Sequence, residues 1–174
     1  MINTILFATD LGAFTAHSLL HVESLAKQYN AKVVVVHAIA PLGEYTNAVL
    51  KTHASEALAP QLLNATDKTA LSALREQIFE SLLRDPLAVE ELLERIADIV
   101  VTLGPPANVI LQEAQRVKAD LIVIGSHGVN AIDGAVLGSV ASKVLQLAKV
   151  PVYMVPMLNP KHYRQADISG WTRQ

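Results

Sequence analysis

The chain has 174 residues, of which 51% are hydrophobic, enough for one domain with a buried core. Lys and Arg total 14 against 16 Asp and Glu, so the formal net charge is -2. No broad cationic surface is available to neutralise a phosphate backbone, which argues against nucleic acid as a partner. Cysteine is absent, which excludes disulfides, thiolate metal sites and cysteine nucleophiles.

The first residues, MINTILFATD, lack a basic region followed by a long apolar stretch. No later segment approaches the roughly 20 apolar residues that a membrane span needs. We therefore expect a cytoplasmic protein without membrane insertion.

Five short runs of β-branched and aliphatic residues predict strands that are buried on both faces. They cover residues 2–8, 32–39, 99–103, 120–124 and 152–155. Helical spacing of apolar residues predicts helices over 15–29, from the proline pair 105–106 to about 117, and from about 137 to 148. This alternation predicts an α/β fold with a doubly wound, five-stranded parallel sheet and helices on both faces.

The stretch from 45 to 97 is too long for a simple crossover. Its apolar spacing predicts two helices, separated near Asp85 and Pro86. They form either a helical excursion packed on the sheet or a partner-binding arm, and ordinary core patterning favours packing. We expect one domain over 1–157, with this excursion inside it, and a polar tail over 158–174.

Residues 120–145 read DLIVIGSHGVNAIDGAVLGSVASKVL, a strand followed by a glycine turn, a loop and a helix start. Gly125 permits a sharp turn, and Gly128 lets backbone amides approach an anion. Gly138 and Ser139 begin the next helix, whose amides, dipole and hydroxyl can hold phosphate oxygens. Glycines also occur in such turns for conformational reasons alone, but three glycines with a serine favour a phosphate site.

The segment matches no Walker A loop, no G-x-G-x-x-G fingerprint and no nucleophile elbow. Its glycines and serine instead follow the spacing G-x2-G-x9-G-S/T. With ILFATD, VVVVHA, LGPPANVILQEA and VPVYMVP elsewhere, the chain resembles the nucleotide-binding branch of the universal stress protein family. The resemblance implies an adenine nucleotide alpha-hydrolase-like fold with strand order 3-2-1-4-5 and bound ATP or AMP. It also implies a nucleotide-dependent regulator or sensor in the stress response, and a homodimer formed through 151–156.

The resemblance further implies roles for individual residues. Positions after the first strand and near the end of the second would meet the nucleoside and the adenine edge: Thr9, Asp10 and Ala38. Positions in the glycine segment would line the ribose and close over the phosphates: Gly125, His127, Gly128, Gly138, Ser139, Val140 and Ala141.

Two departures from the family pattern concern the number of phosphates. Val129 and Asn130 stand where relatives often place a basic residue, and Ala141 lacks a hydroxyl that some members have. The loss of charge-assisted contacts makes AMP an alternative to ATP. Asp133 could hold Mg²⁺ or Mn²⁺ beside the phosphates, although an exposed loop carboxylate is the simpler interpretation.

We find no paired carboxylates, activated nucleophile or phosphate-directed lysine, and therefore predict no catalytic residues. A slow ATP hydrolase and a nucleotide-free dimeric adaptor with an unknown protein partner are the alternatives. His17 and His21 have a spacing that can bind metal, but no third ligand is evident, so we predict no metal site. His37 is expected to form a hydrogen bond near the core.

Overall fold

The computed structural model describes residues 1–12, 14–39, 90–127 and 137–156. Its elements follow in the order β1 (Thr4–Ala8), α1 (Thr15–Tyr29), β2 (Lys32–Ile39), α5 (Glu90–Arg95), β3 (Ile96–Leu103), α6 (Pro106–Arg116), β4 (Leu121–Gly125), α7 (Ser139–Leu147) and β5 (Val152–Val155). Strands and helices alternate as the sequence predicts.

The strands form one parallel sheet in the order β3-β2-β1-β4-β5, which confirms the predicted topology. The central strand β1 is buried along its whole length, as its apolar sequence predicts. The sheet therefore grows from β1 in one direction through β2 and β3, and in the other through β4 and β5.

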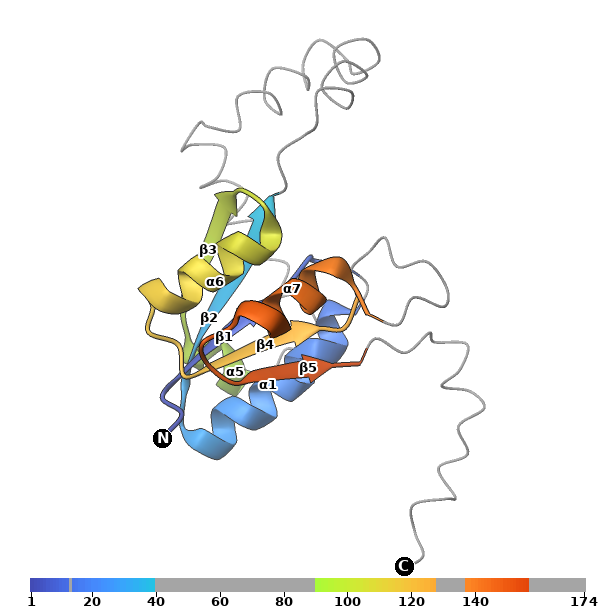
Figure 1. The fold of residues 1–174 in the computed structure, drawn as a ribbon. Coiled ribbons are helices and arrows are strands. Elements are labelled where there is room, and N and C mark those ends of the chain that lie inside the picture. Colours follow the sequence, from blue (N-terminus) through green and yellow to red (C-terminus); the bar gives the residue numbers. More distant parts are fainter. Residues whose placement is uncertain (13, 40–89, 128–136, 157–174) are drawn as a thin grey trace, which may run out of the picture.

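Helices cover both faces of this sheet (Figure 1). Alternate side chains of each strand point to opposite faces, so the sheet supplies two separate cores. One core joins strand residues such as Ile5 and Phe7 to α1 and α5, and the other joins residues such as Leu6 and Ile122 to α6 and α7. This arrangement confirms the predicted helices on both faces.

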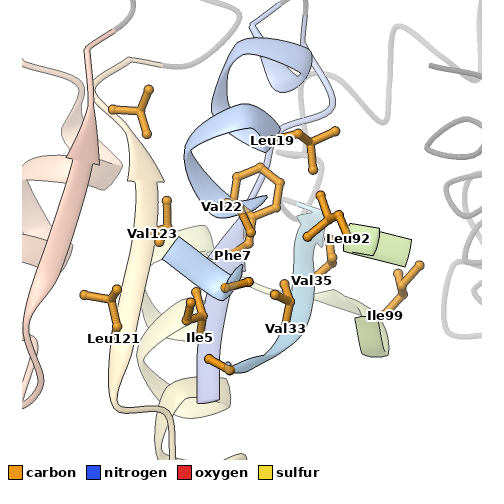
Figure 2. Close-up of a cluster of buried hydrophobic side chains, with 13 residues drawn as sticks. Ile5, Phe7, Leu19, Val22, Val33, Val35, Leu92, Ile99, Leu121 and Val123 are labelled. Carbon is orange, nitrogen blue, oxygen red and sulfur yellow. The ribbon is translucent and has the colours of Figure 1, made fainter. Parts of the chain in front are cut away.

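The core under α1 is shown in Figure 2. Phe7, which is 1% exposed, lies with Leu19 and Val22 of α1 and with Leu92 of α5. The buried residues of α1 recur three or four positions apart, which is why this sequence forms an amphipathic helix. Asn30 ends the helix in the left-handed conformation that asparagine tolerates.

Several predicted boundaries differ from the observed ones. The third strand begins at Ile96 and not at residue 99. The second helix predicted within 45–97, whose apolar spacing includes Ile96, ends at Arg95, so the prediction is wrong at its end. Ile96 pairs with Val33 beside a register irregularity, and this cross-strand pairing overrides the helical spacing. The helix predicted from about 137 begins at Ser139. The first predicted helix of the excursion and the tail lie outside the described residues.

Gly104, between β3 and α6, has a backbone conformation that favours glycine, with φ at 149°. A Cβ added there would lie 2.9 Å from Cγ2 of Val109. We expect Gly104→Ala to lower the free energy of unfolding by about 1–3 kcal/mol, measured by urea denaturation. In a double-mutant cycle, Val109→Ala should cost less stability when Gly104→Ala is present than when it is made alone, because it removes the methyl group that opposes the new Cβ. Strictly additive losses would contradict the steric part of this prediction.

Asp120 joins the start of β1 to the start of β4. Its Oδ2 accepts hydrogen bonds from the amides of Asn3 and Thr4, at 2.8 and 3.0 Å. The bond from Asn3, followed by that from Thr4, holds the pKa of the carboxyl below its usual value of 3.8, against a smaller opposing effect of burial. The carboxylate therefore adds stability above about pH 4, and this contribution is lost as the pH falls through the lowered pKa.

We expect Asp120→Asn to cost about 0.5–1 kcal/mol at pH 7, a modest value because solvent screens the site. Denaturant titrations of the variant and the unchanged protein should converge towards pH 3. An equal difference at both pH values would contradict the assigned cause.

Candidate functional site

The candidate site lies where the direction of sheet growth reverses, between β1 and β4. These two strands are direct neighbours and run parallel, so their carboxyl ends meet at the same edge of the sheet. Ligands of doubly wound sheets bind at this place, because the connections leave the two strands in opposite directions. Thr9 and Asp10 follow β1, and the glycine segment starts at the end of β4.

Thr9 is fixed by hydrogen bonds from several of its atoms. Its amide donates to the Val36 carbonyl at 3.1 Å, and its hydroxyl accepts from the Leu11 amide at 3.0 Å. The hydroxyls of Thr9 and Thr15 are 3.0 Å apart. This network joins the end of β1 to β2 and to the first turn of α1. Thr9 thus holds the turn that presents the neighbouring Asp10.

His37 secures the same turn from β2. Its Nδ1 lies 2.9 Å from the Thr9 carbonyl oxygen, which can only accept, so Nδ1 carries the proton and donates. The predicted hydrogen bond of His37 is confirmed. The histidine immediately precedes Ala38, so one residue connects the ends of β1 and β2, where the family resemblance implies contacts to the nucleoside.

The turn after Thr9 is closed by a second polar side chain. Oδ1 of Asp10 accepts a hydrogen bond from the Gly12 amide at 2.9 Å. Leu11 between them has a φ of 60°, which is unusual for a residue with a side chain. Asp10 is exposed at the edge of the sheet. Its carboxylate is therefore accessible to a ligand at the edge between β1 and β4.

The end of β4 carries a paired serine and histidine. Ser126 is buried, and its Oγ lies 2.9 Å from Nδ1 of the half-buried His127. The Ser126 amide also donates to the Val155 carbonyl at 2.8 Å, which joins this turn to the end of β5. Ser126 is thus a supporting residue that the motif did not single out.

The start of α7 is connected directly to the end of β4. The Gly138 amide donates to the Ser126 carbonyl at 2.9 Å, so the helix N-terminus lies at the edge where β4 ends. Gly138 is the N-cap residue and has no side chain to accept from the first helical amides. These amides and the positive end of the helix dipole form a suitable environment for an anion.

The described predicted residues lie at the carboxyl ends of three strands, β1, β2 and β4, and at the start of α7. Main-chain groups of Ala38 lie in β2, and Ser139 is exposed at the first turn of α7. The side chain of Ala141, only 2% exposed, packs in the core under α7, so only its backbone is suited to a ligand. Gly128 and the loop to residue 136 lie outside the described residues. The supporting groups Thr15, His37 and Ser126 were not assigned to the site from the sequence.

His17 and His21 are neighbours on α1, with ring centroids 5.0 Å apart in an edge-on arrangement. Across the described ranges, no three His, Cys, Asp or Glu side chains gather in a way that could hold a metal ion. In the same part of the chain, no helix combines the length and the apolar character required to cross a bilayer.

The sheet order, the two helical layers and the reversal between β1 and β4 define a doubly wound α/β fold. The family model of the universal stress protein family matches residues 1–156. The chain belongs to the universal stress protein family.

The sequence or the structure of this chain matches the following proteins over nearly their whole length. A universal stress protein of Thermus aquaticus, named for the 3' region of the QAH/OAS sulfhydrylase, is 30% identical over 155 residues, covering 89% of this chain and 99% of that protein. The structure of the hypothetical protein MJ0577 is similar with a TM-score of 0.64 at 25% identity, covering 91% and 99% of the two chains. An Arabidopsis thaliana family protein solved with AMP bound has a TM-score of 0.55 at 16% identity, covering 92% and 94%.

Proposed function

We propose that this protein binds an adenine nucleotide, ATP or AMP, across the carboxyl ends of β1 and β4. The hydrogen bond between Gly138 and Ser126 carries the proposal, because it sets a helix N-terminus beside the reversal point of the sheet. Family membership and the AMP bound to the Arabidopsis protein support adenine nucleotide as the ligand. The protein then acts in the cytoplasm as a nucleotide-dependent regulator of the stress response.

In the proposed binding mode, backbone groups contact the adenine and the phosphates, and a carboxylate side chain contacts the ribose. The main chain at Ala38 recognises the adenine edge, and the carboxylate of Asp10 meets the ribose hydroxyls. The amides from Ser139 to Ala141 hold phosphate oxygens, and Gly125, His127 and Gly128 line the ribose and the phosphates. Since no lysine or arginine is assigned to the phosphates, the site is built to hold a nucleotide rather than to cleave it.

Isothermal titration with ATP, AMP and ribose 5-phosphate tests this function. We expect both adenine nucleotides to bind and ribose 5-phosphate to bind far more weakly, since it lacks the base. Phosphate release from ATP with Mg²⁺ or Mn²⁺ should stay at background. Absence of nucleotide binding at millimolar concentration would overturn the proposal, and steady phosphate release would favour the slow hydrolase.

We also propose that two copies pair through β5, the last strand of the sheet. An edge strand leaves backbone groups open to another strand, and the exposed side chains of Tyr153 and Met154 flank them. Pro151 and Pro156 limit the pairing to this short segment. Sedimentation velocity should give the mass of a dimer, and a monomer at high micromolar concentration would contradict the pairing.

A further inference from the structure

Helix α1 and the edge strand β5 are joined by a small polar cluster of His17, His21 and Tyr153. Nδ1 of His21 lies 2.9 Å from the Tyr153 hydroxyl, and the two rings are 5.7 Å apart. His17 lies edge-on to His21 one helical turn earlier. We call these three residues the edge cluster. None of them belongs to the candidate nucleotide site.

The edge cluster lies where a second strand would pair with β5. In the described part of the chain β5 has β4 as its neighbour on one side, and its other side is the edge of the sheet. Val155 packs into the core under α1, so Tyr153, two residues earlier, faces the same helix. Tyr153 nevertheless remains 36% exposed. A strand added to β5 would therefore cover Tyr153 and approach His21.

We propose that the edge cluster makes pairing of two copies through β5 dependent on pH, with the dimer favoured while the His21 imidazole is neutral and weakened when it is protonated. This inference rests on the dimer of the proposed function and adds its regulation. It does not depend on nucleotide binding.

The physical reason is symmetry. Two identical strands that pair edge to edge are related by a twofold axis, so each copy brings its own edge cluster to the same interface. Protonation then adds like charges on both sides of a surface that has lost water, which costs both repulsion and desolvation. Among the described residues, the titratable groups in printed contact with His21 are His17 on its own helix and Tyr153 on β5.

The protonation of His21 already costs free energy in the single copy. Burial first, and then the neighbouring His17, lowers the pKa of His21 below its usual value of 6.5. A second copy would bury it further and lower the pKa again. By linkage, if the pKa of His21 is lower in the dimer than in the single copy, the dimer is fully stable above the single-copy pKa and weakens as the pH falls through it.

Sedimentation velocity of the full chain at pH 7.5 and pH 5.5 tests the inference. We expect the dimer dissociation constant to rise by about tenfold or more at the lower pH, which corresponds to one pKa unit of additional shift. His21→Gln keeps a polar side chain that does not titrate, so its dissociation constant should be nearly equal at both pH values. Lys149→Gln, a matched control just before β5, makes the same replacement at a residue outside the edge cluster and should preserve the pH ratio.

His17→Gln gives a second, independent result. It removes the imidazole that helps to lower the pKa of His21, so that pKa should rise. The dimer should then begin to dissociate at a higher pH than in the unchanged protein. A dimer whose affinity does not change with pH, or a His21→Gln protein that keeps the full pH ratio, would overturn the inference while leaving the dimer intact. A monomer at both pH values would refute the dimer and the inference together, and nucleotide titration would still test the site separately.

Discussion

Gly138→Asp should abolish most nucleotide binding and leave the fold intact. The backbone of Gly138, at φ −66° and ψ 148°, is accessible to any residue, and Asp is a favoured N-cap side chain. Its carboxylate would accept from the α7 amides that the proposed site offers to phosphate, and its charge would repel the ligand. We expect the dissociation constants for AMP and ATP to rise by about 100-fold, equivalent to roughly 2–3 kcal/mol.

Gly138→Asn, measured in the same titration, separates the effect of the added charge from the effect of a side chain that caps the α7 amides. Asparagine also caps a helix but carries no charge, so it should weaken binding less than aspartate does. The thermal midpoint of both variants without ligand should equal or exceed that of the unchanged protein. If Gly138→Asp bound nucleotide normally, α7 would not be part of a phosphate site.

Phe7→Ala should cause the largest loss of stability, about 3–5 kcal/mol. Phe7 is 1% exposed and lies between the sheet, α1 and α5, where removal of its ring would leave a cavity in a close-packed core (Figure 2). Urea denaturation should show a lower midpoint with an unchanged slope.

Leu147→Ala is the matched control for this loss. It also truncates a large apolar side chain, but Leu147 is 53% exposed at the end of α7, so we expect a change within about 0.5 kcal/mol. Similar losses in the two variants would show that Phe7 does not occupy the core as described.

Much of the fold follows from local sequence patterns. The range Thr15–Tyr29 is predicted to the residue, because its apolar spacing acts within a few positions. The apolar runs identify all five strands, since strands of a parallel sheet are buried on both faces. The order 3-2-1-4-5 came from family resemblance, because strand order depends on contacts that no local pattern records.

The contacts that the sequence did not supply join distant residues. His37 bonds to a carbonyl 28 positions earlier, and His21 to a hydroxyl 132 positions later. Such partners depend on which strands become neighbours, and a single sequence carries no sign of them. The early start of β3 has the same origin, because pairing with β2 extends the strand into a segment with helical spacing.

The central position of β1 has a mechanical consequence. Between the β3-β2-β1 half and the β4-β5 half of the sheet, the ladder from Ile5 and Leu121 to Ala8 and Ile124 is the seam. A nucleotide that contacts Asp10 on one side and the α7 amides on the other would bind to both halves at once. Separation of the halves would then require loss of the nucleotide. The free energy of unfolding would therefore increase with the nucleotide concentration in the cell.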